Sequence, residues 1–196
     1  MQFKNVNWLG LISGILLLAV VPLSFINPWW QLRIGDFGSA NFSPLKNDFS
    51  FLGITFFMPL LTAINISCLL LLSISAALMI VYSVDPTKTY SNQLLGWSYK
   101  NPLAILITFL GGIVALSLLA SYIAKQYAHI DFTLPIMGTT LIQVPSELLG
   151  EFSGAQIGLA VSGAFQWTFC LAIAATVLCL ATRISARAKP VANATI

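Results

Sequence analysis

The stretch that decides the fold is FQWTFCLAIAATVLCLATR, residues 165–183, in which the final arginine is the only charge. No charged residue occurs between Glu151 and Arg183, and two further cations, Arg187 and Lys189, follow closely. A run this long and this apolar satisfies its backbone polar groups inside a bilayer only as a helix. Lys and Arg accumulate in short cytoplasmic segments, so the cationic end marks the cytoplasmic side.

The composition extends this interpretation to the whole chain. Of its 196 residues, 58% are hydrophobic and 8% are charged, and its mean hydropathy is +0.88. A soluble domain is about 25% charged, so we expect a membrane protein whose first partner is the lipid bilayer. The net charge of +3 is too small to indicate a nucleic-acid partner.

Three more apolar runs precede the one just quoted. The predicted spans are residues 8–27, 60–84, 102–124 and 164–184, in one membrane domain covering 1–196. The segments expected outside are 28–59 and 125–163. Of the nine cations, five fall in the remaining segments, Arg183 lies at the inner end of the last span and three fall in the outer segments, so both termini should be cytoplasmic in a multi-pass protein of the cell membrane.

The two outer segments carry short β-prone runs between glycines and prolines. Residues 30–34 alternate in polarity and then meet a glycine, which predicts a strand and a turn. Residues 139–144 and 156–161 are further strand candidates. Residues 49–59 are aromatic and β-prone, and Pro59 suits the first turn of a helix. The alternative for this stretch is one long, kinked helix from Phe51.

The fold class predicted from these patterns is membrane α-helical. We expect a bundle of four transmembrane helices with a small extracellular antiparallel β-sheet cap formed by both outer segments. Between the second and third spans, Gln93–Trp97 is a candidate short amphipathic helix lying on the lipid.

Several residues within the predicted spans are candidates for contacts between helices. Glycines close together let helix backbones approach, which applies to Gly10 with Gly14 and to the pair Gly111 and Gly112. Asn65 is the amide within the second span, and we expect it to form an interhelical hydrogen bond.

Aromatic residues at span ends predict contacts with the membrane–water interface. Trp29 and Trp30 follow the first span, and Trp97 precedes the third. Among the sequons, Asn41 lies in an outer segment and is a candidate glycosylation site.

Nothing in the spans suggests catalysis. Asp, Glu, Lys, Arg and His are absent from their interiors, whereas intramembrane chemistry usually needs such groups. The single histidine has only scattered carboxylates near it, which is a weak metal set: His129, Asp131, Glu147 and Glu151. The three cysteines fall inside apolar runs and resemble small buried hydrophobes: Cys68, Cys170 and Cys179. We therefore predict no catalytic, cofactor or metal site, and no enzyme.

Four spans, strand-rich outer segments and the position of Trp29 and Trp30 resemble the claudin-like tetraspan architecture. The first outer loop of that family also carries a Gly-Leu-Trp motif and two cysteines, which this chain lacks. The resemblance is therefore one of architecture. It implies that strands from both outer segments join in one sheet above the helices.

The functional hypothesis is a structural or accessory membrane protein. Its β-rich exterior cap would mediate self-assembly or docking with other membrane proteins, because strand edges are templates for pairing. The alternatives are a small channel or transporter, and a non-catalytic subunit of a membrane redox complex.

Overall fold

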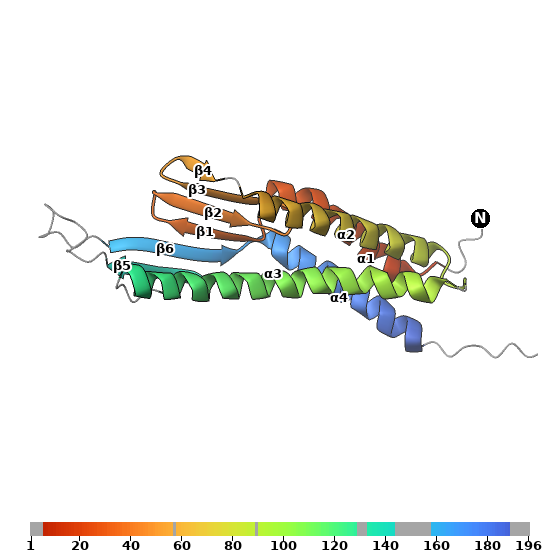
Figure 1. The fold of residues 1–196 in the computed structure, drawn as a ribbon. Helices are drawn as coiled ribbons and strands as arrows, with labels where there is room; N and C mark the ends of the chain where they lie inside the picture. The colour runs from red at the N-terminus through yellow and green to blue at the C-terminus, as the bar shows by residue number, and fades with distance from the viewer. Residues whose placement is uncertain (1–5, 57, 89, 129–132, 144–157, 189–196) are drawn as a thin grey trace, which may run out of the picture.

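The computed structural model describes residues 6–56, 58–88, 90–128, 133–143 and 158–188. Within them, four helices are long and apolar enough to cross a membrane, as predicted. They are α1 (Trp8–Ile26), α2 (Pro59–Val84), α3 (Ser91–Ala128) and α4 (Trp167–Ala188). The start of α1 and the end of α4 lie at the end of the molecule opposite the sheet (Figure 1). This arrangement is compatible with a tetraspan plan.

The helix α3 is longer than the predicted third span. It begins at Ser91, so the expected separate helix at Gln93–Trp97 is instead the first part of α3. Pro102 lies inside α3, and the neighbouring Asn101 Nδ2 donates to Ser75 Oγ on α2 at 3.1 Å. Proline is tolerated in such helices where neighbouring groups re-satisfy the backbone. With 38 residues, α3 is about 57 Å long and runs from the far end of the bundle to the side of the sheet (Figure 1).

Both predicted outer segments contribute to one antiparallel sheet of six strands. Its order is β4-β3-β2-β1-β6-β5, and every neighbouring pair is antiparallel. The first segment supplies four strands and the second supplies two, and the β1–β6 pairing joins them. The strands are β1 (Trp30–Ile34), β2 (Gly38–Phe42), β3 (Asn47–Phe51), β4 (Ile54–Phe56), β5 (Gly138–Gln143) and β6 (Gly158–Phe165).

The stretch before α2 forms a hairpin and not part of a long helix. The strands β3 and β4 are joined by Leu52 and Gly53, with φ of 51° and 78°. Two positive φ values in a two-residue loop match the twist of the flanking strands. Glycine adopts this conformation freely, whereas leucine rarely does. α2 then begins at Pro59, where the missing N–H is harmless.

The helices bury several small residues and leave many large apolar ones exposed. In α1, Gly10, Ser13 and Gly14 are buried, whereas Ile12 and Ile15 are about half exposed. The Ser13 hydroxyl donates to the Gly10 carbonyl of its own helix at 2.8 Å, so its burial leaves no unmet hydrogen bond. Between helices in lipid, close backbone packing replaces the hydrophobic effect as the main attraction. The helix exterior therefore suits acyl chains as its surroundings.

The two faces of the sheet differ in chemistry. Trp30 and Leu32 form a core cluster with Ile113 of α3, so one face packs against that helix. Successive side chains of a strand point to opposite faces, and Gln31 and Arg33 accordingly lie on the other side. That second face is polar, and no helix covers it among the residues that the structure describes (Figure 1).

An aromatic cluster joins the sheet to the helices. Trp29 lies between α1 and β1, with ring centroids 5.2 Å from Phe109 of α3 and 5.9 Å from Phe169 of α4. The Thr168 hydroxyl, at the start of α4, donates to the Pro28 carbonyl at 2.7 Å. Because three helices meet here, the junction fixes the sheet relative to the bundle.

Candidate binding surface on the sheet

The polar face of the sheet is organised in rows that cross the strands. One row follows from the pairing register of all six strands, from β5 to β4. It consists of five hydroxyl residues and one arginine, namely Thr139, Ser162, Arg33, Ser39, Ser50 and Thr55. Side chains directly opposite each other across neighbouring strands lie within interaction distance. Arg33 is therefore flanked by hydroxyl residues on both neighbouring strands, Ser39 on β2 and Ser162 on β6.

A second row of polar residues crosses the same face two residues further along the strands, closer to the helices. Gln31 of β1 is paired with Asn41 of β2, which is paired with Asp48 of β3. Asp48 forms an ion pair with Lys46, whose Nζ lies 2.9 Å from Asp48 Oδ2, and both side chains are about half exposed. The Asn41 amide oxygen is buried and has no hydrogen-bond partner within the described structure.

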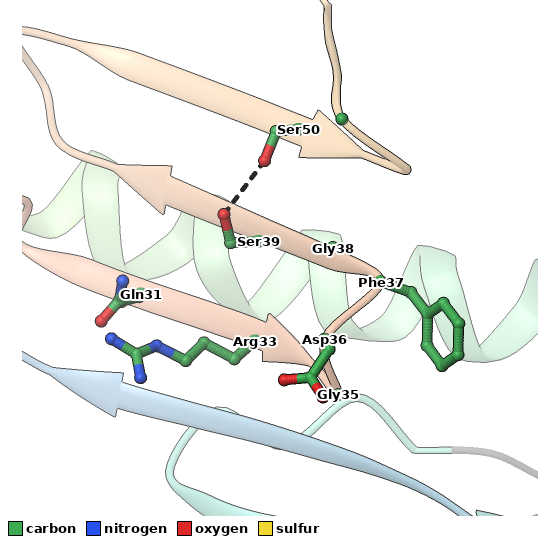
Figure 2. Close-up of a pocket in the computed structure, with 9 residues that line it drawn as sticks. Gln31, Arg33, Gly35, Asp36, Phe37, Gly38, Ser39 and Ser50 are labelled. Carbon is green, nitrogen blue, oxygen red and sulfur yellow. Dashed lines mark hydrogen bonds between the residues drawn. The ribbon is translucent and has the colours of Figure 1, made fainter.

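A shallow hollow of about 350 Å³ lies over this face. Figure 2 shows Gln31 and Arg33 with their polar ends together, and the Asp36 carboxylate at the other end. The Ser39 and Ser50 hydroxyls form a hydrogen bond at 3.1 Å. The lining consists of Gln31, Arg33, Gly35, Asp36, Phe37, Gly38, Ser39, Ser50 and Gly53.

The charged groups of the hollow are not paired with each other. The ion pairs among the described residues are Lys46–Asp48 and Lys88–Asp85, and neither involves Arg33 or Asp36. Arg33 and Asp36 are both exposed, and their formal charges cancel. The hollow therefore offers hydrogen-bond donors and acceptors at a lining with no net charge.

Glycines of the predicted packing set fall into two groups. A Cβ at Gly10 would collide with Ser83 Oγ of α2 and lie 3.1 Å from Thr182 Cγ2 of α4. A Cβ at Gly14 would lie 2.7 Å from Ile80 Cγ1. These two glycines allow α1 to approach its neighbours closely.

Gly111 and Gly112 differ from the other two. Both are exposed, and a Cβ at either would have no heavy atom within 4 Å. The expectation that they form a contact between helices is therefore corrected for the described part of the chain. Glycine spacing in a sequence does not tell which side of a helix faces a neighbour.

Asn65 joins α2 to the sheet and not to another helix. With its amide nitrogen facing carbonyls, it donates to the Pro44 and Leu61 carbonyl oxygens at 3.2 Å each. Its oxygen then accepts from Asn47 Nδ2 at 3.2 Å. Pro44 lies between β2 and β3 and Asn47 is the first residue of β3, so the predicted interhelical bond is corrected to a bond between helix and sheet.

The three tryptophans predicted to lie at the membrane interface differ in their exposure. Trp29 and Trp30 are 1% and 0% exposed, so they lie in the protein core and not at a membrane surface. Trp30 Nε1 donates to the Ile136 carbonyl at 2.7 Å, and Trp29 Nε1 donates to Ser24 Oγ at 2.7 Å. Trp97 is 65% exposed on α3. Only Trp97 is therefore placed where an interfacial role is open to it.

The candidate glycosylation site lies within a strand. Asn41 is in β2, with its side chain partly buried. The hydroxyl of Ser43, the third residue of the sequon, is buried and donates to the Ser24 carbonyl at 3.3 Å. This geometry makes the sequon part of the folded sheet.

The weak metal set cannot be placed. His129, Asp131, Glu147 and Glu151 lie outside the described residues. Among those described, no group of three or more His, Cys, Asp or Glu side chains is arranged to hold a metal ion.

The polar rows were not anticipated from the sequence. Alternation at Gln31 and Arg33 indicated an outward polar face for one strand. The rows depend on which residues of the six strands stand opposite each other, and local patterns do not set that register.

No protein-family model matches this chain. No curated protein matches it significantly either.

Proposed function

We propose that this chain is a non-enzymatic structural or accessory protein of the cell membrane, with cytoplasmic termini and the sheet outside. Supporting the membrane assignment, all four long helices are apolar and expose large side chains. The excess of cations in the terminal and middle segments supports the orientation. The claudin-like architecture enters only as an analogy of plan.

The function that we propose for the sheet is assembly with a second copy or docking in a larger membrane complex. The observation that carries it is the edge strand β4. All three of its residues are exposed, and its outer side pairs with no described strand. Ile54 is 61% exposed and Leu52 at the adjoining turn is 65% exposed. An exposed apolar edge strand is a template for pairing with another chain.

A feature of the adjoining turn strengthens this proposal. Leu52 has a φ of 51°, a conformation that costs a non-glycine residue about 1–3 kcal/mol. Strain of this kind persists where surrounding structure enforces it and is concentrated at binding and switch regions. In the proposed assembly, the Leu52 side chain packs against the partner.

The test is the mass of the assembly in lipid nanodiscs or mild detergent. Phe51 and Ile54 close the two-residue loop as a hydrogen-bonded pair, so the Thr55 N–H points to the open edge. Thr55→Pro removes that donor and should shift the protein toward monomers. Thr55→Val keeps the N–H and should leave the assembly intact.

A wild-type protein that stays a lone monomer at high concentration, with no stoichiometric partner in a native pull-down, would overturn the assembly proposal. Equal behaviour of the proline and valine variants would instead rule out pairing through β4.

A further inference from the structure

We propose that the polar face of the sheet binds a saccharide over the hollow around Arg33. The ligand class is a hydroxylated sugar ring, carried either by a free oligosaccharide or by the headgroup of a glycolipid. The proposal does not rest on the assembly through β4, because the charged, amide and aromatic groups it uses lie on β1 and in the turn after it, namely Gln31, Arg33, Asp36 and Phe37.

The first step is the mixture of donors and acceptors. Arg33 offers only donors, Asp36 only acceptors, and Gln31 offers both. The hydroxyls of Ser39 and Ser50 are already hydrogen-bonded to each other, and each retains capacity for a further bond. Sugar hydroxyls donate and accept, so one ring can satisfy both ends of the hollow.

The second step is charge. The two ionised groups that line the hollow, Arg33 and Asp36, have opposite signs. Nearby, Lys46 and Asp48 neutralise each other in an ion pair. A free phosphate bound at Arg33 would share the hollow with the carboxylate of Asp36 at its other end. An uncharged, polar ligand fits this balance better than an anion.

The third step is the aromatic ring at the edge of the hollow. Phe37 lies in the turn between β1 and β2, lines the hollow and is 54% exposed. Figure 2 shows its ring at the end of the hollow near Asp36. An exposed ring provides an apolar surface beside polar groups, and the C–H face of a sugar ring packs against such a surface. Gly35 and Gly38 flank this turn and also line the hollow.

The experiment uses the full chain in nanodiscs of synthetic phospholipid, after purification without maltoside or glucoside detergents. In one arm, maltotriose, chitotriose and mannotriose are titrated to about 10 mM and followed by calorimetry, which detects dissociation constants near 1 mM. In a second arm, nanodiscs containing glycolipid are compared with phospholipid nanodiscs by native mass spectrometry. A third arm titrates inorganic phosphate.

The variants are Arg33→Ala and, as a matched cation control, Lys46→Ala. Saccharide or glycolipid binding should weaken by at least about tenfold in Arg33→Ala and by less than about twofold in Lys46→Ala. Arg33 is exposed, so the melting temperature of Arg33→Ala should stay close to that of the wild type, which separates lost binding from lost folding.

Binding confined to the soluble sugars identifies a free oligosaccharide as the ligand, and binding confined to the second arm identifies a glycolipid. Either result supports the proposal. Phosphate binding without sugar binding, equal losses in the two variants, or no binding in either saccharide arm would overturn it.

Discussion

The helices and the sheet of this chain differ in what they expose. In the helices, small residues such as Gly14 and Ser75 lie inside together with apolar ones such as Leu72, and large apolar residues such as Leu118, 67% exposed, also lie outside. In the sheet, Trp30 and Leu32 lie inside, and polar residues lie outside. The hydrophobic effect acts between protein and water and not between helices in lipid. One chain thus contains parts suited to two solvents.

The same residue type is buried in one part of the molecule and exposed in another. A tryptophan is core in the sheet at Trp30 and surface on a helix at Trp97, and a glycine is a contact at Gly14 and open surface at Gly111. Paired substitutions of one residue type can therefore break the comparison or sharpen it.

The largest effect is expected for Trp30→Ala. The change empties a fully buried site and removes the hydrogen bond to the Ile136 carbonyl, so the free energy of unfolding should fall by about 3–5 kcal/mol. Reversible unfolding in mixed micelles measures this quantity. In Trp97→Ala, a change within about 0.5 kcal/mol is expected at an exposed site. Similar losses in both variants would contradict the assignment of Trp30 to a core.

Next in size is Gly14→Val. The new Cβ would approach Ile80 Cγ1 at 2.7 Å and the backbone atoms Ile80 N and Ala76 O at 3.2 and 3.3 Å. Backbone atoms cannot move aside cheaply, so α1 and α2 should separate at a loss of about 1–3 kcal/mol. The control is Gly111→Val, which meets no atom within 4 Å and should cause no loss in the same unfolding assay. If it destabilises the isolated chain equally, that face is not open.

A smaller loss is expected for Asn65→Leu, which cuts the link between helix and sheet. It leaves the partly buried Asn47 amide and the Pro44 carbonyl without their partner, at a loss of about 1–2 kcal/mol. Hydrogen exchange should rise in the connection between β2 and β3. Thr62→Val provides a comparison, because the Thr62 hydroxyl bonds only within its own helix, to Met58 at 3.2 Å. Unchanged exchange in Asn65→Leu would show that the link is dispensable.

The smallest effect concerns pH at the turn after α2. The Thr87 hydroxyl, donating at 3.0 Å, and then Lys88 lower the pKa of Asp85 below 3.8. Because the pKa of Asp85 is lower in the folded state, its ionised carboxylate stabilises the fold. This stabilisation is complete above pH 3.8 and is lost as the pH falls through the folded-state pKa. The melting temperatures of the wild type and Asp85→Asn should therefore differ above pH 3.8 and converge below it. If the two melting temperatures instead move apart as the pH falls, the pKa of Asp85 is raised on folding and the prediction is wrong.

Local patterns predicted much of the architecture. The alternation at residues 30–34 gave β1, the β-prone run at 156–161 overlaps β6, and Pro59 indicated the start of α2. The predicted third span, 102–124, lies within α3, but this helix begins earlier, at Ser91, and continues through Pro102. A proline restricts its own neighbourhood, but tertiary contacts decide whether a helix continues.

The environment of single side chains was not predictable from local sequence. Trp29 and Trp30 follow an apolar run, and this position is typical of an interfacial belt. Their partners, among them Phe109, Phe169 and Ile136, lie far away along the chain. The polar row through Arg33 likewise depends on pairing between distant segments. Burial and register are properties of the assembled fold, and a window of neighbours does not contain them.

The pairing of β1 with β6 also has a consequence for synthesis. Roughly 120 residues separate the two strands, and translation at 5–20 residues per second needs about 6 to 24 s to cover them. During that interval β1 has a partner on one side only, while α2 and α3 are synthesised. The nascent chain thus carries an unpaired central strand edge for longer than any other pairing of the sheet requires. The sheet is completed immediately before α4, the last helix to be synthesised.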